Sequence, residues 1–159
     1  MALIACKIVE VCVFKFENDR PLYLLLHRSK DEKIYPDIWQ LISGSIEGTE
    51  KAYEAAMREL TEETGMKPKA FWVVPFVNSF YDHDYDAVNL SPLFAAQVEP
   101  GDEPKLSSEH YESGWFLYAD AVRQLVWPGQ REGLRIVDEY VIKGEEAGKL
   151  TRIRKKFIG

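Results

Sequence analysis

The sequence has few cysteines, and this shortage narrows what the protein can be. Its two cysteines, Cys6 and Cys12, lie six residues apart in one strand-like run of the 159-residue chain. An extended strand separates them by roughly 20 Å, at about 3.3 Å per residue, which is beyond the reach of a disulfide. We therefore expect two small buried thiols in a reducing compartment. Their spacing from His27, His83 and His110 fits no zinc pattern.

Long apolar runs and excess positive charge are also missing. No apolar run approaches the ~20 residues that a membrane-spanning helix needs. The apolar first sixteen residues are interrupted by Lys7 and Glu10, and they lack the basic start and cleavage site of a signal peptide. The formal net charge is −6, whereas a general nucleic-acid binder is usually basic. We therefore expect a cytoplasmic protein whose partner is neither a membrane nor a nucleic acid.

The residues that are present favour one mixed α/β domain over 1–159, with a basic tail at about 149–159. The chain is 46% hydrophobic and 13% aromatic, which suits a single sizeable core. Turn residues at 18–21 predict that the first two strands form a hairpin, so the fold should be an α/β or α+β sandwich with a mixed sheet. The predicted strands are 3–16, 22–28, 39–44, 71–81, 88–98 and 111–118, and the predicted helices are 50–64, 119–126 and 130–142.

The stretch RELTEETG, residues 58–65, concentrates acidic charge near the end of the helix predicted over 50–64. Residues three or four apart are neighbours on a helix, so Glu59, Glu62 and Glu63 crowd one arc. Like charges at this spacing destabilise a helix by roughly 0.2–0.5 kcal/mol per pair. Either water screens them on a solvated face, or a cation lies among them. Hard divalent cations bind converging carboxylate oxygens, and phosphate oxygens can complete their shell.

The rest of this helix has a recognisable start, end and core face. Thr49 is the expected N-cap, and Gly65 is the glycine expected to end the helix. A helical wheel places small residues on the acidic arc, where they leave room beside the carboxylates. These small residues are Ala52, Ala55 and Ala56, and the predicted core-facing stripe is Tyr53, Met57 and Leu60.

From Gly44 the chain reads GSIEGTEKAYEAAMRELTEETGM, which resembles the Nudix box. That box is Gly, five residues, Glu, seven residues, then Arg-Glu-apolar-X-Glu-Glu-X-Gly-apolar. The resemblance implies an α/β/α sandwich whose loop–helix–loop binds Mg²⁺ or Mn²⁺. It also implies a hydrolase that cleaves a diphosphate linked to another moiety by water attack at phosphorus. Every defined position is filled, by Gly44, Glu50, Arg58, Glu59, Leu60, Glu62, Glu63, Gly65 and Met66.

By this resemblance Glu59 and Glu63 are the principal metal ligands, and Glu62 is a further or water-bridged ligand. The carbonyl of Ser43 is a candidate backbone ligand. Glu109, beside a histidine in the segment SSEHYE, resembles another metal ligand of the family, and its alternative reading is a solvated loop glutamate. The general base stays open among Glu62, Glu63, Glu109 and a hydroxide on the metal. Glu50 is expected to support the cluster, and Arg58 to pair with Glu50 or orient a ligand carboxylate.

The segment WQLISGSIEGTE resembles a bacterial subfamily that cleaves dihydroneopterin triphosphate or dATP. The expected partner is therefore a small nucleotide or pterin polyphosphate, and dimers are common among similar enzymes. A tyrosine about 15 residues past the box also resembles dinucleoside polyphosphate hydrolases, which are the alternative substrate class. A non-catalytic nucleotide-binding module is the alternative of a different class. The candidate substrate-binding residues are Lys7, Arg28, Ser43, Gly44, Tyr81 and Tyr85.

Overall fold

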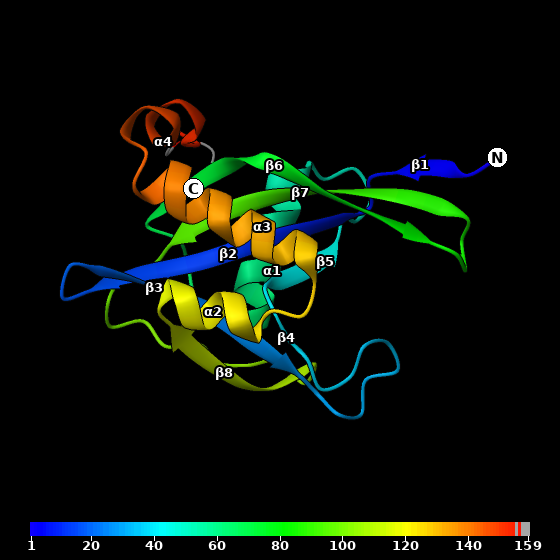
Figure 1. The fold of residues 1–159 in the computed structure, drawn as a ribbon, viewed down its shortest axis with the longest axis horizontal. Coiled ribbons are helices and arrows are strands. Elements are labelled where there is room, and N and C mark those ends of the chain that lie inside the picture. The colour runs from blue at the N-terminus through cyan, green and yellow to red at the C-terminus, as the bar shows by residue number, and fades with distance from the viewer. Residues whose placement is uncertain (155, 157–159) are drawn as a thin grey trace.

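A mixed eight-stranded sheet lies between helices in the computed structural model, which describes residues 1–154 and 156 (Figure 1). This α/β/α arrangement confirms the predicted fold class. The strands are β1 Leu3–Ala5, β2 Ile8–Glu17, β3 Arg20–Arg28, β4 Trp39–Gln40, β5 Ile42–Ser45, β6 Ala70–Asp82, β7 Ala87–Gln97 and β8 His110–Phe116. The helices are α1 Ala52–Thr64, α2 Tyr118–Gln124, α3 Pro128–Ile136, the π-helical η1 Val137–Ile142 and α4 Glu145–Thr151.

Strand β2 is the centre of the sheet. It pairs antiparallel with β3, which confirms the predicted hairpin, and it pairs parallel with β7 and antiparallel with β5. Its side chains are buried on both faces, with Val9 and Val11 in one core cluster and Cys12 and Phe14 in the other. A strand covered on both faces needs apolar residues at successive positions, which explains why this run does not alternate with polar ones.

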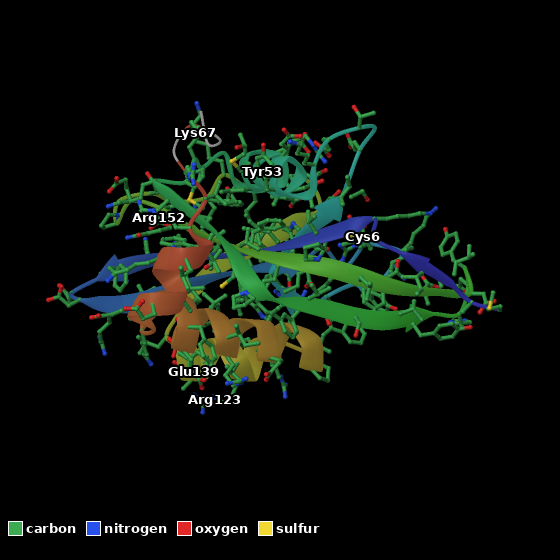
Figure 2. The ribbon with its side chains drawn as sticks, turned by 90° about the horizontal axis from the view of Figure 1, so that it is seen from above. Cys6, Tyr53, Lys67, Arg123, Glu139 and Arg152 are labelled. Atoms are coloured by element: carbon green, nitrogen blue, oxygen red, sulfur yellow. The ribbon has the colours of Figure 1, made fainter. Side chains whose placement is uncertain are left out.

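The helices lie on opposite faces of this sheet. Seen from above, α1 with Tyr53 covers one face, and the helices that carry Arg123 and Glu139 cover the other (Figure 2). Within residues 1–154 and 156, no helix is both long and apolar enough to cross a membrane.

Helix α1 buries the predicted stripe and two alanines beside it. Leu60 is buried in the core, and the half-buried Tyr53 and Met57 pack against the same cluster, as expected. Ala55 and Ala56, which the helical wheel places on the acidic arc, are fully buried as well, because their small side chains let the helix lie close to the sheet. The acidic arc therefore turns inward at Glu59 and Glu63, which are also buried.

The ends of α1 confirm one prediction and correct another. Gly65 ends the helix with φ 71°, a left-handed conformation that favours glycine. The N-cap is Lys51 and not Thr49. The backbone N–H of Lys51 donates to Glu54 Oε2 at 2.7 Å, so a side chain of the first turn reaches back to satisfy the helix start.

Three further predictions need correction outside α1. The run 3–16 is broken at Cys6 and Lys7 into β1 and β2, and Cys6 is exposed while Cys12 is buried as expected. The start of the basic tail is held more firmly than a solvated end, because α4 includes residues 149–151 and Ile153 N–H donates to Phe71 O at 2.8 Å. Residues 155 and 157–159 of that tail lie outside the described residues.

Candidate active site

Glutamates dominate a cavity of ≈ 370 Å³ between the end of α1 and β5. Side chains from the last two turns of α1 form one wall, and β5 forms the wall opposite. The loop before β8 adds a further glutamate, so acidic charge gathers here from segments that are far apart in the sequence. The lining residues are Ser43, Gly44, Ser45, Glu47, Glu59, Glu62, Glu63 and Glu109.

Gly44 allows α1 to place a carboxylate directly against β5. Gly44 pairs with Val9 of β2, so its position is held by the sheet. A Cβ atom added at position 44 would lie 1.9 Å from Cδ of Glu59, which leaves no space for any side chain. The glycine of the box is therefore required by this close approach, and Glu59 is 8% exposed as a result.

Arg58 holds several carboxylates of the cluster together. Its Nη2 lies 2.7 Å from Glu50 Oε1, which confirms the predicted pairing of these two residues. Its Nη1 lies 2.9 Å from Glu59 and 3.1 Å from Glu62, and Nη2 also donates to Ser45 O at 2.7 Å. The hydrogen bond from Arg58 lowers the pKa of Glu50. Arg58 therefore links the box loop to α1 and offsets part of the acidic charge.

Glu63 is held by two residues that are not among those lining the cavity, His110 and Ser107. His110 Nδ1 lies 2.8 Å from its Oε2, and Ser107 Oγ donates to the same oxygen at 3.3 Å. Burial alone would raise the pKa of Glu63, but His110, Glu109 and Ser107 together hold it below its ordinary value. Burial and the neighbouring Glu63 carboxylate raise the pKa of Glu109. The two carboxyl groups therefore differ in their readiness to hold a proton.

The donor set of this cavity fits a divalent metal ion. Burial raises the pKa of Glu59 despite its contact with Arg58, so the protein alone does not fully compensate this charge. One ligand atom from each of Glu63, Glu109 and His110 lies within 4.8 Å of the others. Carboxylate oxygens are the ligands that hard cations prefer, and several of them converge here. The family uses divalent metals, and the glutamates that line this cavity could hold one.

A larger cavity of ≈ 530 Å³ lies between the start of α1 and residues 152–154. Its described lining is apolar with Lys51, Arg152 and Arg154 at its edge, and none of those residues is a carboxylate. It therefore lacks the ligands that a divalent cation requires, and the acidic cavity remains the better candidate.

The predicted substrate contacts fall in different places. Ser43 lines the acidic cavity together with Gly44. Arg28 lies opposite His110 in the pairing of β3 with β8, and its Nη2 lies 3.2 Å from Glu32. Among residues 1–154 and 156, its buried Nε has no hydrogen-bond partner. Lys7 is exposed, and its backbone oxygen accepts a hydrogen bond from Ile46 N–H at 2.8 Å.

Tyr81 and Tyr85 lie at the far end of the β6–β7 hairpin and do not line the acidic cavity. Tyr81 pairs with Val88 in the hairpin, and its hydroxyl donates to Asp86 at 2.9 Å. Both tyrosines are exposed. The positions of Tyr81 and Tyr85 therefore do not support the predicted role in binding substrate.

Sequence reasoning assigned no role to Gln40, Ser107 or the imidazole of His110, although all three lie around Glu63 or its partner. Gln40 Nε2 is 3.0 Å from His110 Nε2. The sequence did place Gln40 on the face of its short strand opposite to that of Trp39, because successive side chains of a strand point to opposite faces. What the sequence could not supply is the pairing of β3 with both β4 and β8, which brings these residues together.

Comparison with known proteins decides which family this site belongs to. The NUDIX domain matches residues 7–136, which include the whole box and every residue that lines the acidic cavity. The chain belongs to the Nudix family. The family and its hydrolase relatives indicate a pyrophosphohydrolase enzyme, as the sequence predicts.

Curated Nudix relatives are distant. The chain is 26% identical to the nucleoside triphosphatase NudI of Escherichia coli over 121 residues, which are 72% of this chain and 86% of that protein. It is 29% identical to an octanoyltransferase of Myxococcus xanthus over 134 residues, or 80% of this chain. That second match spans only 35% of the octanoyltransferase, so this Nudix chain resembles about a third of it.

A solved structure supports the Nudix fold. The Ap4A hydrolase of C. elegans, in a binary complex, superposes with a TM-score of 0.74 over 87% of this chain and 99% of the other, at 18% identity. Similarity at this identity concerns the fold and leaves the substrate undetermined.

Proposed function

We propose that this Nudix chain is a Mg²⁺-dependent pyrophosphohydrolase that cleaves a nucleoside- or pterin-type triphosphate to the monophosphate and pyrophosphate. The observation that carries the proposal is the pair of buried carboxylates, Glu59 and Glu63, at the acidic cavity beside Gly44. A bound Mg²⁺ ion would supply charge neutralisation for the phosphates and a lower pKa for water. Mn²⁺ is the alternative ion, because it accepts the same carboxylate ligands.

The chain's own residues bind and orient the reactants. Glu59 and Glu63 hold the cation, with Glu62 and Glu109 as further oxygen donors and the carbonyl of Ser43 as a backbone ligand. Arg58 on α1 holds the loop before this helix in place through its ion pair with Glu50. In the reaction, the oxygen of water bonds to phosphorus and the phosphorus–oxygen bond to pyrophosphate breaks. The proton of that water passes to one of the cavity carboxylates, Glu62, Glu63 or Glu109.

Arg28 is the residue best suited to bind the phosphate chain. Its guanidinium cannot lose its charge, and its buried Nε has no partner in the described part of the chain, so an anion could accept a hydrogen bond there. The backbone beside Arg28 supports this role, because Ser29 N–H donates to the carbonyl oxygen of Glu109, a residue that lines the cavity, at 2.9 Å. A guanidinium can bind two phosphate oxygens at once, which suits a polyphosphate better than a single neutral group.

The decisive experiment replaces the buried carboxylates with their neutral isosteres. We expect Glu59→Gln and Glu63→Gln each to lower kcat by about 10³-fold, the scale for losing a group that stabilises transition-state charge. Circular dichroism and thermal melting should remain close to the wild type. Glu146→Gln, an exposed substitution on α4, is the matched control and should keep wild-type activity. A near-normal rate in either cavity variant would contradict the assigned ligands.

A substrate panel separates the alternatives. The panel contains nucleoside and pterin triphosphates, dinucleoside polyphosphates and nucleotide sugars, each with Mg²⁺ or Mn²⁺. Release of pyrophosphate from a triphosphate supports the proposal. Splitting of a dinucleoside polyphosphate in preference to triphosphates would favour the alternative substrate class. Tight binding without turnover of any member would favour a non-catalytic nucleotide-binding module.

A further inference from the structure

Three buried polar side chains form a continuous series behind the acidic cavity. Gln40 on β4 is 3.0 Å from Nε2 of His110, and Nδ1 of His110 is 2.8 Å from Oε2 of Glu63 on α1. The exposed fractions of Gln40, His110 and Glu63 are 7%, 5% and 5%. Burying polar groups costs free energy unless they are paired, so a series of three in one place calls for a role.

His110 is fixed from both ends of its ring. With the Gln40 amide as donor, the ring proton is assigned to Nδ1, which faces Glu63. The backbone of His110 is paired with Arg28 of β3, which fixes the position from which the ring extends. The contact between Nδ1 and Oε2 is short, but its angle falls outside that of a well-formed hydrogen bond.

Both contacts behind the cavity fall on the same oxygen of Glu63. Ser107 Oγ donates to Oε2, and His110 Nδ1 approaches Oε2. A carboxylate that is held by one oxygen presents the other oxygen in a defined direction. Mutating the groups that orient a metal ligand typically lowers metal affinity by about 10–100-fold.

We propose that His110 is a positioning residue for Glu63, which engages Oε2 and so turns Oε1 toward the cation, while Gln40 holds the ring in place. This inference rests on the proposed function and adds to it the residue that orients one metal ligand. His110 is not itself a ligand in this arrangement, because each ring nitrogen already faces a protein group.

The test compares two amides that imitate different nitrogens of the ring. The Asn side chain places its Nδ2 close to the position of histidine Nδ1, whereas the longer Gln side chain reaches toward the position of Nε2. His110→Asn should therefore retain the contact with Glu63, and His110→Gln and His110→Ala should lose it. The readout is the Mn²⁺ dissociation constant from electron paramagnetic resonance, measured on the whole chain without substrate.

We expect His110→Gln and His110→Ala to weaken Mn²⁺ binding by about 10–100-fold, and His110→Asn to stay within about threefold of the wild type. His27→Gln is the matched control. His27 also lies between two carboxylates, at 2.8 Å from Glu112 and 2.9 Å from Asp37, but it does not line the acidic cavity. The control should bind Mn²⁺ like the wild type.

Two results would overturn the inference. The first is equal Mn²⁺ affinity in all three His110 variants. The second is a nitrogen hyperfine coupling of a directly bound imidazole in the Mn²⁺ spectrum of the wild type, which would make His110 a ligand. That measurement needs no variant, so it decides the matter even if a substitution prevents folding. If His110 has no effect while Glu63→Gln abolishes turnover, this inference fails and the proposed function stands. If Glu63→Gln is itself unimpaired, the proposed function fails.

Discussion

Replacing Gly44 with alanine probes the close approach on which the acidic cavity depends. The added Cβ would lie 1.9 Å from Cδ, 2.2 Å from Oε1 and 2.4 Å from Cγ of Glu59. Ordinary carbon–carbon contact begins at about 3.5 Å, so the carboxylate must move away by roughly 1.5 Å. A misplacement of about 1 Å can cost about 10²-fold in rate. We therefore expect Gly44→Ala to lower kcat by about 10²-fold or more and to weaken Mn²⁺ binding.

The same substitution should also lower the free energy of unfolding, by about 1–3 kcal/mol, because it overpacks a filled site. Gly101→Ala is the matched control, since a Cβ at that position meets no atom of the described residues within 4 Å. The assays are phosphate-product release for kcat, electron paramagnetic resonance for Mn²⁺ affinity, and urea denaturation for stability. Wild-type kcat and Mn²⁺ affinity in a folded Gly44→Ala protein would refute the reasoning.

Three further predictions concern charge and metal. Arg28→Ala should raise KM by roughly 10-fold or more, with a smaller change in kcat, because one charge-assisted hydrogen bond contributes about 1.5–3 kcal/mol. Steady-state kinetics on the best substrate of the panel measures both constants, and an unchanged KM would contradict the prediction. Burial raises the pKa of Glu10 despite hydrogen bonds from Asn78 and Gln130. Protonated Glu10 therefore stabilises the folded protein fully at pH values below the ordinary pKa of 4.5, and this stabilisation is lost as pH rises through the pKa in the folded state. The unfolding free energy of Glu10→Gln relative to the wild type should therefore increase as pH rises through that window in urea titrations, and a constant difference would refute the burial argument. Mn²⁺ at about 100 times its dissociation constant should stabilise the native state by about 2.7 kcal/mol, and EDTA should reverse this shift in the melting temperature; equal melting temperatures would indicate that the cavity binds no ion.

The sequence was most informative where local chemistry and spacing act together. The β2–β3 hairpin followed from turn residues at 18–21, and the end of α1 followed from Gly65, because both depend on backbone conformations that few residues adopt. The N-cap and the core face of α1 were less predictable. Lys51 rather than Thr49 begins the helix because Glu54 reaches back to it, and Ala55 and Ala56 face the sheet because they permit close packing.

By itself, the sequence determined the family and the class of chemistry, since nine defined box positions at fixed spacing leave little freedom in what the loop and helix can bind. Only the tertiary structure decided how the glutamates differ. Glu59 and Glu63 are buried and Glu62 is exposed, although all three share one arc of the helix. Only the sheet brings Gln40, His110 and Ser107 together around Glu63, because contacts between residues far apart in the chain depend on strand pairing, which local spacing does not encode.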